Sequence, residues 1–209
     1  MRFQPGLLAA PRQFPIIEST VSGTSGWSMV ASYNAILPSG IVVGDLLLLA
    51  STRLPSSPPA GWSSLISQSK LAVLVREASG AEGGSVTLNG AQGYWDHVAY
   101  RISGVNPEHL AAAYEPSCWL PALSAPWGES KNCWVAIGAG DYIQPTPPEG
   151  YTTDQHVSVF YGRMTSAHRM LEAASVSGKT DDPRGPTGGP GFLPDNASMR
   201  AGLVVIGPR

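Results

Sequence analysis

The sequence predicts an all-β protein, a two-sheet, jelly-roll-like β-sandwich with an extended N-terminal arm. The 209 residues include 24 glycines and 19 prolines, a share typical of short strands joined by many turns. Apolar residues make up 43% of the chain, enough for a substantial core. Short apolar or alternating segments recur between turn signals roughly every 8–12 residues, and no convincing long helix interrupts them. We therefore expect about nine to eleven strands in two packed sheets.

Two stretches of the chain share one plan. In residues 41–66 an apolar run is followed by a Pro/Ser loop and then by the corner Pro58-Pro59-Ala60-Gly61-Trp62. In residues 132–153 the corner is Pro147-Pro148-Glu149-Gly150-Tyr151, at an offset of 150 − 61 = 89 residues. The prolines stiffen the approach, the glycine allows the bend and the aromatic ring caps the core. The repetition predicts two halves related by a pseudo-dyad, as quasi-repeats of about residues 40–105 and 132–206.

The individual strands are assigned from the spacing of apolar residues. Residues 42–52 and 132–139 are apolar on both faces and predict central strands, whereas residues 96–103 alternate and predict one buried face. Residues 107–114 suit one or two helical turns. Residues 170–177 also have helical propensity, but their place in the repeat favours a strand. Turns are expected at residues 21–26 and at Asn89-Gly90. In chain order the expected strands are 27–33, 42–52, 63–67, 71–77, 85–88, 96–103, 132–139, 155–164, 170–177 and 197–207.

Residues 1–20 predict an extended arm that precedes a sandwich domain of residues 21–209. Pro5, Pro11 and Pro15 exclude a helix and a central strand in this segment. Its apolar side chains would be costly to leave in water, so we expect the arm to lie on this domain or on a neighbouring subunit. The residues expected to make these assembly contacts are Phe3, Leu7, Leu8, Phe14, Ile16 and Ile17.

Residues 115–131 are expected to form a long Pro/Trp loop inserted between the two quasi-repeats. The loop carries Trp119 and Trp127 between several prolines. A rigid loop of this kind presents indole rings to sugars or to another subunit, or folds them back over the core, and the sequence leaves these alternatives open. The remaining tryptophans are expected in or between the sheets, and they are Trp27, Trp62, Trp95 and Trp134.

The charge pattern argues against several classes of partner. The net charge is −2, the pI is about 6.1 and there is no basic run, so nucleic acid is not an expected partner. No apolar run approaches the roughly 20 residues of a membrane-spanning helix. The first residues lack the ordered regions of a signal peptide, which predicts synthesis in a cytoplasm. Only 13% of residues are charged, which favours a surface partly covered by other subunits.

No motif for catalysis, for a metal or for a cofactor is present. The sequence has no nucleophile elbow, and its four histidines lack metal-ligand spacing. We expect the histidines to be structural or solvated, and they are His97, His109, His156 and His168. A weak calcium candidate combines Asp181-Asp182 with Asp154 or Asp195. A disulfide between Cys118 and Cys133 stays open, although synthesis in a cytoplasm favours free thiols.

The first half of the chain resembles a β-sandwich domain of structural proteins from tailed bacteriophages and prophages. The resemblance lies in the order of an apolar strand after Gly-Asp, a Pro-x-Gly-Trp corner and a strand that ends before Gly-Val. It covers residues 40–105 well and residues 132–206 loosely, and it leaves out the arm and the Pro/Trp loop. The matching positions are Gly44, Asp45, Pro59, Gly61, Trp62, Leu65, Arg76, Gly80, Tyr100, Arg101, Gly104 and Val105.

The resemblance implies a non-enzymatic virion protein, made in the cytoplasm of the host bacterium. The leading expectation is a capsid decoration or other head-associated protein that oligomerises on the particle, with copies of itself and other virion proteins as partners. The short chain without fibre-like repeats favours the head over the tail. The alternative is a tail or fibre component that binds a host surface glycan or receptor through Trp119 and Trp127. A sandwich hydrolase is a weaker third possibility.

Overall fold

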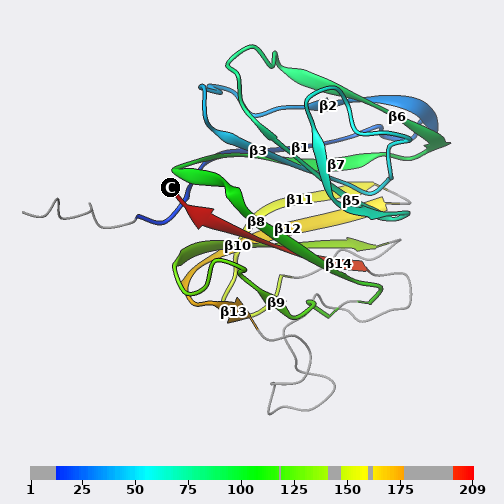
Figure 1. The fold of residues 1–209 in the computed structure, drawn as a ribbon. Coiled ribbons are helices and arrows are strands. Elements are labelled where there is room, and N and C mark those ends of the chain that lie inside the picture. The colour runs from blue at the N-terminus through cyan, green and yellow to red at the C-terminus, as the bar shows by residue number, and fades with distance from the viewer. Residues whose placement is uncertain (1–12, 118, 141–146, 160–161, 177–199) are drawn as a thin grey trace, which may run out of the picture.

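The protein is described by a computed structural model that places residues 13–117, 119–140, 147–159, 162–176 and 200–209. The predicted all-β sandwich is confirmed, because these residues form fourteen strands and no helix. Accordingly, the described part of the chain contains no helix that could cross a membrane. The strands stack in layers, as Figure 1 shows.

Two antiparallel five-stranded sheets form the centre of the molecule. The first sheet has the order β1-β7-β3-β5-β4 and the second has the order β11-β12-β10-β14-β8. The strands of the first sheet are β1 (Ile16–Thr24), β3 (Leu46–Ser51), β4 (Ser63–Gln68), β5 (Leu71–Glu77) and β7 (Asp96–Ser103). Those of the second sheet are β8 (Val105–Glu115), β10 (Lys131–Gly140), β11 (Thr152–Val159), β12 (Gly162–Glu172) and β14 (Arg200–Pro208).

A smaller layer covers the outer face of each sheet. Over the first sheet, β2 (Val30–Ile36) pairs with β6 (Ser85–Gly93); over the second, β9 (Leu123–Ser124) pairs with β13 (Ser175–Val176). Three apolar cores result, one between the sheets and one under each outer layer. The central strands are therefore buried on both faces. This explains why β3 and β10 read as unbroken apolar runs.

The two halves of the chain build the two sheets in the same way. β1 and β8 begin 105 − 16 = 89 residues apart, and β4 and β11 begin 152 − 63 = 89 residues apart. The outer layers share one register, because Ala35 pairs with Val86 and Ser124 pairs with Ser175, both pairs at the same offset. The offset is larger between β5 and β12, where the equivalent residues Val75 and His168 are 168 − 75 = 93 residues apart, and β14 follows the segment 177–199, which lies outside the described residues.

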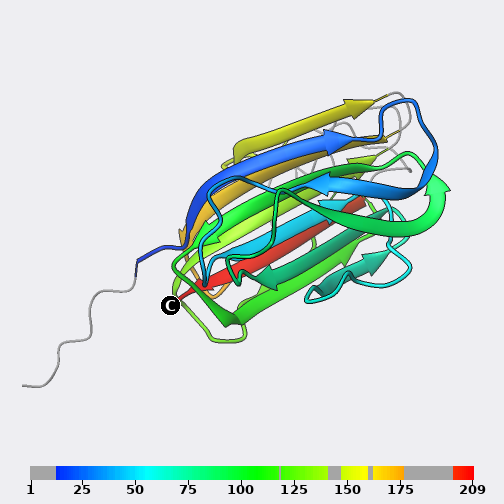
Figure 2. The ribbon, with the colours of Figure 1, turned by 90° about the horizontal axis from the view of Figure 1, so that it is seen from above.

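The two sheets pack face to face so that each edge of one sheet meets the non-equivalent edge of the other. β1 of the first sheet contacts β11 of the second, and β4 contacts β8 at the other side. Because β1 is equivalent to β8 and β11 is equivalent to β4, exchanging equivalent strands turns the β1–β11 contact into the β4–β8 contact. A two-fold axis between the sheets produces this relation. The sandwich consequently has two equivalent sides, one where β1 meets β11 and the other where β4 meets β8 (Figures 1 and 2). Each side has a cavity, and we call these two places the side openings.

The corners that mark the repeat have the same geometry. Gly61 and Gly150 have φ values of 78° and 80°, a left-handed conformation that suits glycine. In each corner the aromatic residue donates its backbone N–H to the carbonyl of the second proline, over 3.0 Å from Trp62 and 3.2 Å from Tyr151. Each ring packs on an outer core rather than between the sheets.

Several expected elements are placed differently. β1 begins at Ile16, so part of the expected arm is an edge strand, and the expected turn at 21–26 lies largely within β1. β8 replaces the expected helical turns, because its small side chains pair with β14. Asn89-Gly90 lies inside β6. There an added Cβ at Gly90 would meet the Trp95 ring at 3.1 Å, so the glycine serves close packing.

Candidate functional site

The expected glycan-binding tryptophans do not form an exposed platform. Trp119 is 6% exposed and packs in the outer core of the second sheet. Trp127 stacks on His109 with ring centroids 4.9 Å apart, and its indole N–H donates to Asn132 Oδ1 over 3.0 Å. The loop folds back because the outer face of β10 and β14 is apolar and requires a cover. Sugar stacking on Trp119 is therefore wrong as an expectation.

The expected assembly residues fall into three groups. Phe3, Leu7 and Leu8 lie outside the described residues. Ile17 packs against the central core, whereas Ile16 on the same strand is 50% exposed. The Phe14 ring lies 5.9 Å from the Lys131 ammonium.

The polar residues considered for metals or disulfides are dispersed. Among the described residues no group of three His, Cys, Asp or Glu side chains could hold a metal ion. Cys133 is a free thiol in the central core, and burial raises its pKa. Cys118, Asp181, Asp182 and Asp195 lie outside the described residues.

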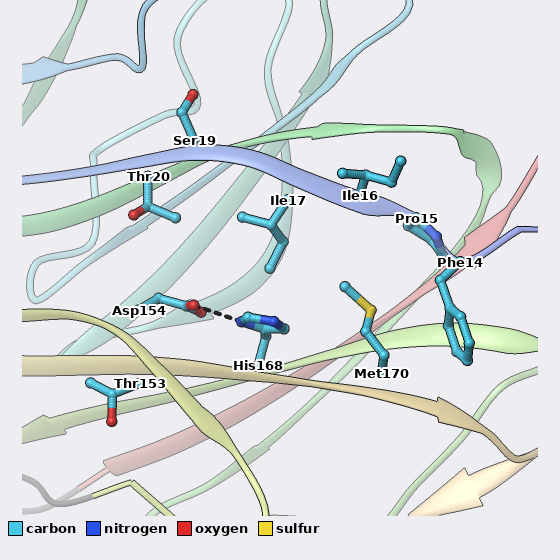
Figure 3. Close-up of a pocket in the computed structure, with 10 residues that line it drawn as sticks. All are labelled: Phe14, Pro15, Ile16, Ile17, Ser19, Thr20, Thr153, Asp154, His168 and Met170. Atoms are coloured by element: carbon cyan, nitrogen blue, oxygen red, sulfur yellow. Dashed lines mark hydrogen bonds and ion pairs between the residues drawn. The ribbon is translucent and has the colours of Figure 1, made fainter.

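The side opening between β1 and β12 contains a cavity of about 570 Å³. Phe14, Ile17 and Met170 form apolar walls, and Thr20 and Thr153 add hydroxyl groups. Asp154 and His168 also line it, and Figure 3 shows the carboxylate turned toward the imidazole beneath Ile17. The volume falls within the range of roughly 300–1,000 Å³ that is usual for small-molecule sites.

Asp154 joins the cavity to the central core through two hydrogen bonds. The Tyr100 hydroxyl donates to Asp154 Oδ2 over 2.9 Å, and His168 Nδ1 lies 2.6 Å from Asp154 Oδ1. The Asp154 side chain is 7% exposed and that of His168 is 22% exposed. Burial, reinforced by the Asp154 charge, raises the pKa of Tyr100 well above its usual range, so the hydroxyl stays protonated.

A β-bulge turns Asp154 inward. The pairing of β11 with β12 shifts between Thr153 and Gln155, so the residue between them leaves the regular alternation. The first half has the same bulge between Ser64 and Ile66, where the intervening residue is Leu65. The duplicated fold thus places an aspartate at a position that holds a leucine in its equivalent.

The equivalent side opening, between β8 and the strands β4 and β5, is smaller and chemically different. Its cavity measures about 300 Å³ and includes Leu65, Glu77 and Leu110. Ser63 on β4 pairs with Val75, and Thr152 on β11, which is 152 − 63 = 89 residues later, pairs with His168. Val75, which also lines this smaller cavity, is therefore the counterpart of His168. Of the two side openings, only the one formed by the second half contains an inward-facing Asp–His pair.

Side-chain hydrogen bonds fix the edge of the larger opening. Gln155 Nε2 donates to Thr20 Oγ1 over 2.7 Å, and the Ser22 hydroxyl donates to Gln155 Oε1 over 3.0 Å. These bonds tie β1 to β11 across the two sheets. The sequence suggested Asp154 as a weak calcium candidate and His168 as structural or solvated. Their pairing was missed because Tyr100, Asp154 and His168 meet only in the fold. The departure from the repeat at Leu65 and Asp154 was the available signal.

A second notable feature is a set of exposed apolar residues in the first half. Every exposed large hydrophobic side chain among the described residues lies between residues 16 and 54. Trp27, expected in the core, is 72% exposed. We use "apolar end surface" for Ile16, Val42 and Val43, which lie at the end of the sandwich where β1 begins and the turn before β3 runs, because Ile16 pairs with Ser103 beside the Leu46–Ile102 pair.

The turn that presents Val42 and Val43 is held in place by a buried carboxylate. Asp45, 2% exposed, accepts a hydrogen bond from the Val42 backbone N–H over 3.0 Å. It also pairs with Arg101 at 2.5 Å. Val43 contacts the next loop, where an added Cβ at Gly80 would lie 3.1 Å from its side chain. The two valines, 53% and 76% exposed, are therefore displayed by an ordered turn.

Comparison with known proteins finds no matching family model, no matching curated protein and no matching solved structure. The resemblance to phage virion proteins consequently stays a prediction.

Proposed function

We propose that this protein is a non-enzymatic structural protein of a bacteriophage virion, most simply a head-associated decoration protein, that self-associates through its apolar end surface. The observation that carries the proposal is the ordered display of Val42 and Val43 at 53% and 76% exposure. Exposed apolar side chains on a fixed turn lose little conformational entropy when a partner covers them. The low charge content of the chain agrees with a surface that is partly covered in an assembly.

The second half provides an internal contrast. The positions 89 residues after Val42 and Val43 are Lys131 and Asn132, where β10 continues and pairs with β12. Asn132 is buried and binds Trp127 and the Ala173 carbonyl. The fold therefore does not require two exposed valines at this corner. The solvent exposure of the two valines is better explained by a binding partner than by a requirement of the fold.

The proposal is tested by sedimentation of the full chain over a range of concentrations. We expect a concentration-dependent oligomer, and we expect the Val42→Asp/Val43→Asp variant to be a folded monomer because charges are costly in an apolar contact. The control Ser67→Asp/Gln68→Asp adds the same charge on exposed β4 and should remain oligomeric. A wild-type chain that is monomeric at every concentration, or a double valine variant that still assembles, contradicts the proposal.

Recruitment to empty phage capsids tests the virion role separately. The wild-type chain should sediment with the capsids, and the double valine variant should stay in the supernatant if the same surface contacts the shell. If the chain oligomerises but never sediments with capsids, the proposed self-association stands and the proposed head-associated role is refuted.

A further inference from the structure

The Asp–His pair in the larger side opening is a feature that folding does not require. Burying a carboxylate costs several kcal/mol before its partners compensate, roughly as for other buried ions. The equivalent bulge in the first half is occupied by Leu65, which packs against the central core. The duplicated scaffold therefore accommodates an apolar residue at this position. A polar pair that is dispensable for the fold and lines a cavity points to ligand binding.

The hydrogen bonds define what the cavity offers to a ligand. The Asp154 carboxylate accepts, so Nδ1 of His168 carries the proton that it donates to Oδ1. The other ring nitrogen, Nε2, has no hydrogen-bond partner in the described part of the chain and is left for a ligand. Both Asp154 oxygens are already engaged, by Tyr100 and by His168. Asp154 and Tyr100 thus act as positioning residues for the imidazole.

The rest of the lining selects the class of ligand. Thr20 Oγ1 accepts from Gln155, so its own O–H remains available to donate, and Thr153 adds a second hydroxyl. Phe14, Ile17 and Met170 supply an apolar wall with one aromatic ring (Figure 3). No lysine or arginine lines the cavity among the described residues, which disfavours an anionic ligand. A compact ring with hydroxyl groups on its edge and C–H groups on its face matches these groups.

We propose that the side opening between β1 and β12 binds a neutral sugar unit, with His168 Nε2 hydrogen-bonded to a sugar hydroxyl. The Thr20 hydroxyl donates to a sugar oxygen, and the C–H face of the ring packs on Phe14 and Met170. This binding is a further property of the chain, and its proposed sugar contacts use residues other than Ile16, which borders both the cavity and the apolar end surface. It places glycan recognition in a pocket of the β1 edge and not on the Pro/Trp loop.

The test is an NMR titration of the full chain with single sugars, observing the His168 imidazole. The probes are glucose, galactose, mannose and N-acetylglucosamine, each raised to its solubility limit. We expect at least one of them to shift the His168 resonances in a saturable way. We expect His168→Leu, followed through the backbone amide resonances of β1 and β11, to weaken that binding about tenfold or more, as loss of one hydrogen bond to the ligand would.

Matched variants separate binding from folding. Glu77→Gln alters the carboxylate that lines the smaller opening and should leave the affinity within about twofold, well below one lost hydrogen bond. Thr20→Ala should weaken binding in the same direction as His168→Leu, and it serves if His168→Leu does not fold. The proposal is overturned if none of the four sugars shifts the His168 resonances, or if both Thr20→Ala and His168→Leu bind like the wild type. Sedimentation of the same samples reports on assembly independently.

Discussion

Burial shifts the pKa values of two adjacent residues at the start of β7 in opposite directions. Asp96 is fully buried, and burial raises its pKa to about 6. His97 is also fully buried, and burial lowers its pKa to about 4. The ring of His97 is bonded to the Tyr33 hydroxyl over 2.8 Å and to the Ile36 carbonyl over 3.0 Å. The carbonyl can only accept, so Nε2 carries the proton and Tyr33 donates to Nδ1.

These shifts predict a compensated pH dependence. Asp96 favours folding at low pH, and that contribution is lost as the pH rises from the usual aspartate pKa toward 6. His97 favours folding above its usual pKa, and that contribution is lost as the pH falls toward 4. Between pH 4 and 6 the two slopes, each about 1.4 kcal/mol per pH unit, have opposite signs. The contributions of these two residues to the wild-type free energy of unfolding should therefore nearly cancel across this pH range.

Asp96→Asn should remove one of the two slopes. Its free energy of unfolding should then fall by about 1.4 kcal/mol for each pH unit between 6 and 4, because only His97 still titrates there. Urea unfolding at pH 4, 5, 6 and 7 measures this. Parallel curves for the variant and the wild type would show that Asp96 does not titrate in this range.

Single-residue environments were the least predictable level from the sequence. Trp27 was expected in the core because tryptophan usually is, but it precedes β2 and is 72% exposed. His97 was expected to be structural or solvated, and it is fully buried on a central strand under the outer layer. Both outcomes depend on which segments cover the outer faces of the sheets. The periodicity of one strand carries no information about such a cover.

At the scale of elements, the repeat supplied more information than local propensity. Residues 170–177 were assigned as strand against their helical propensity, and β12 and β13 occupy that region. β8 was missed because it lies outside the portion of the repeat recognised at the corners, although it begins 89 residues after β1. Propensity alone favoured helical turns there, and pairing with β14 decides the outcome.

The Pro/Trp loop acts as a structural cover, which predicts the effect of truncating its tryptophans. Trp119→Ala should lower the free energy of unfolding by about 3–5 kcal/mol, because it leaves a large cavity over β10 and β14. Trp127 is only partly buried, so Trp127→Ala should cost less. Urea unfolding of both variants checks this order. A destabilisation below about 1 kcal/mol for Trp119→Ala would contradict a role in the outer core.

At the scale of the whole molecule, one scaffold is used twice and each copy departs from the common pattern. The first half exposes Val42 and Val43 where the second half continues β10. The second half buries Asp154 where the first half has Leu65. The sequence predicted the two-sheet sandwich from its turns and apolar runs. It did not show which strand edges face each other, so neither side opening was foreseen.

The central claim is that these departures serve function and are not needed for the fold. Removing Asp154 alone would leave the buried Tyr100 hydroxyl without its acceptor, at a cost of about 1–3 kcal/mol. Replacing both partners with apolar groups avoids that cost and resembles the first half, so the fold should tolerate it. Tyr100→Phe also keeps the ring that packs between the sheets.

The most direct measurement is therefore the free energy of unfolding of the Tyr100→Phe/Asp154→Leu variant, determined with urea beside the wild type and the single Asp154→Leu variant. We predict that the double variant is at least as stable as the wild type and more stable than the single variant. A double variant that loses about 3 kcal/mol or more, as expected when a structurally required buried pair is broken, would contradict the account.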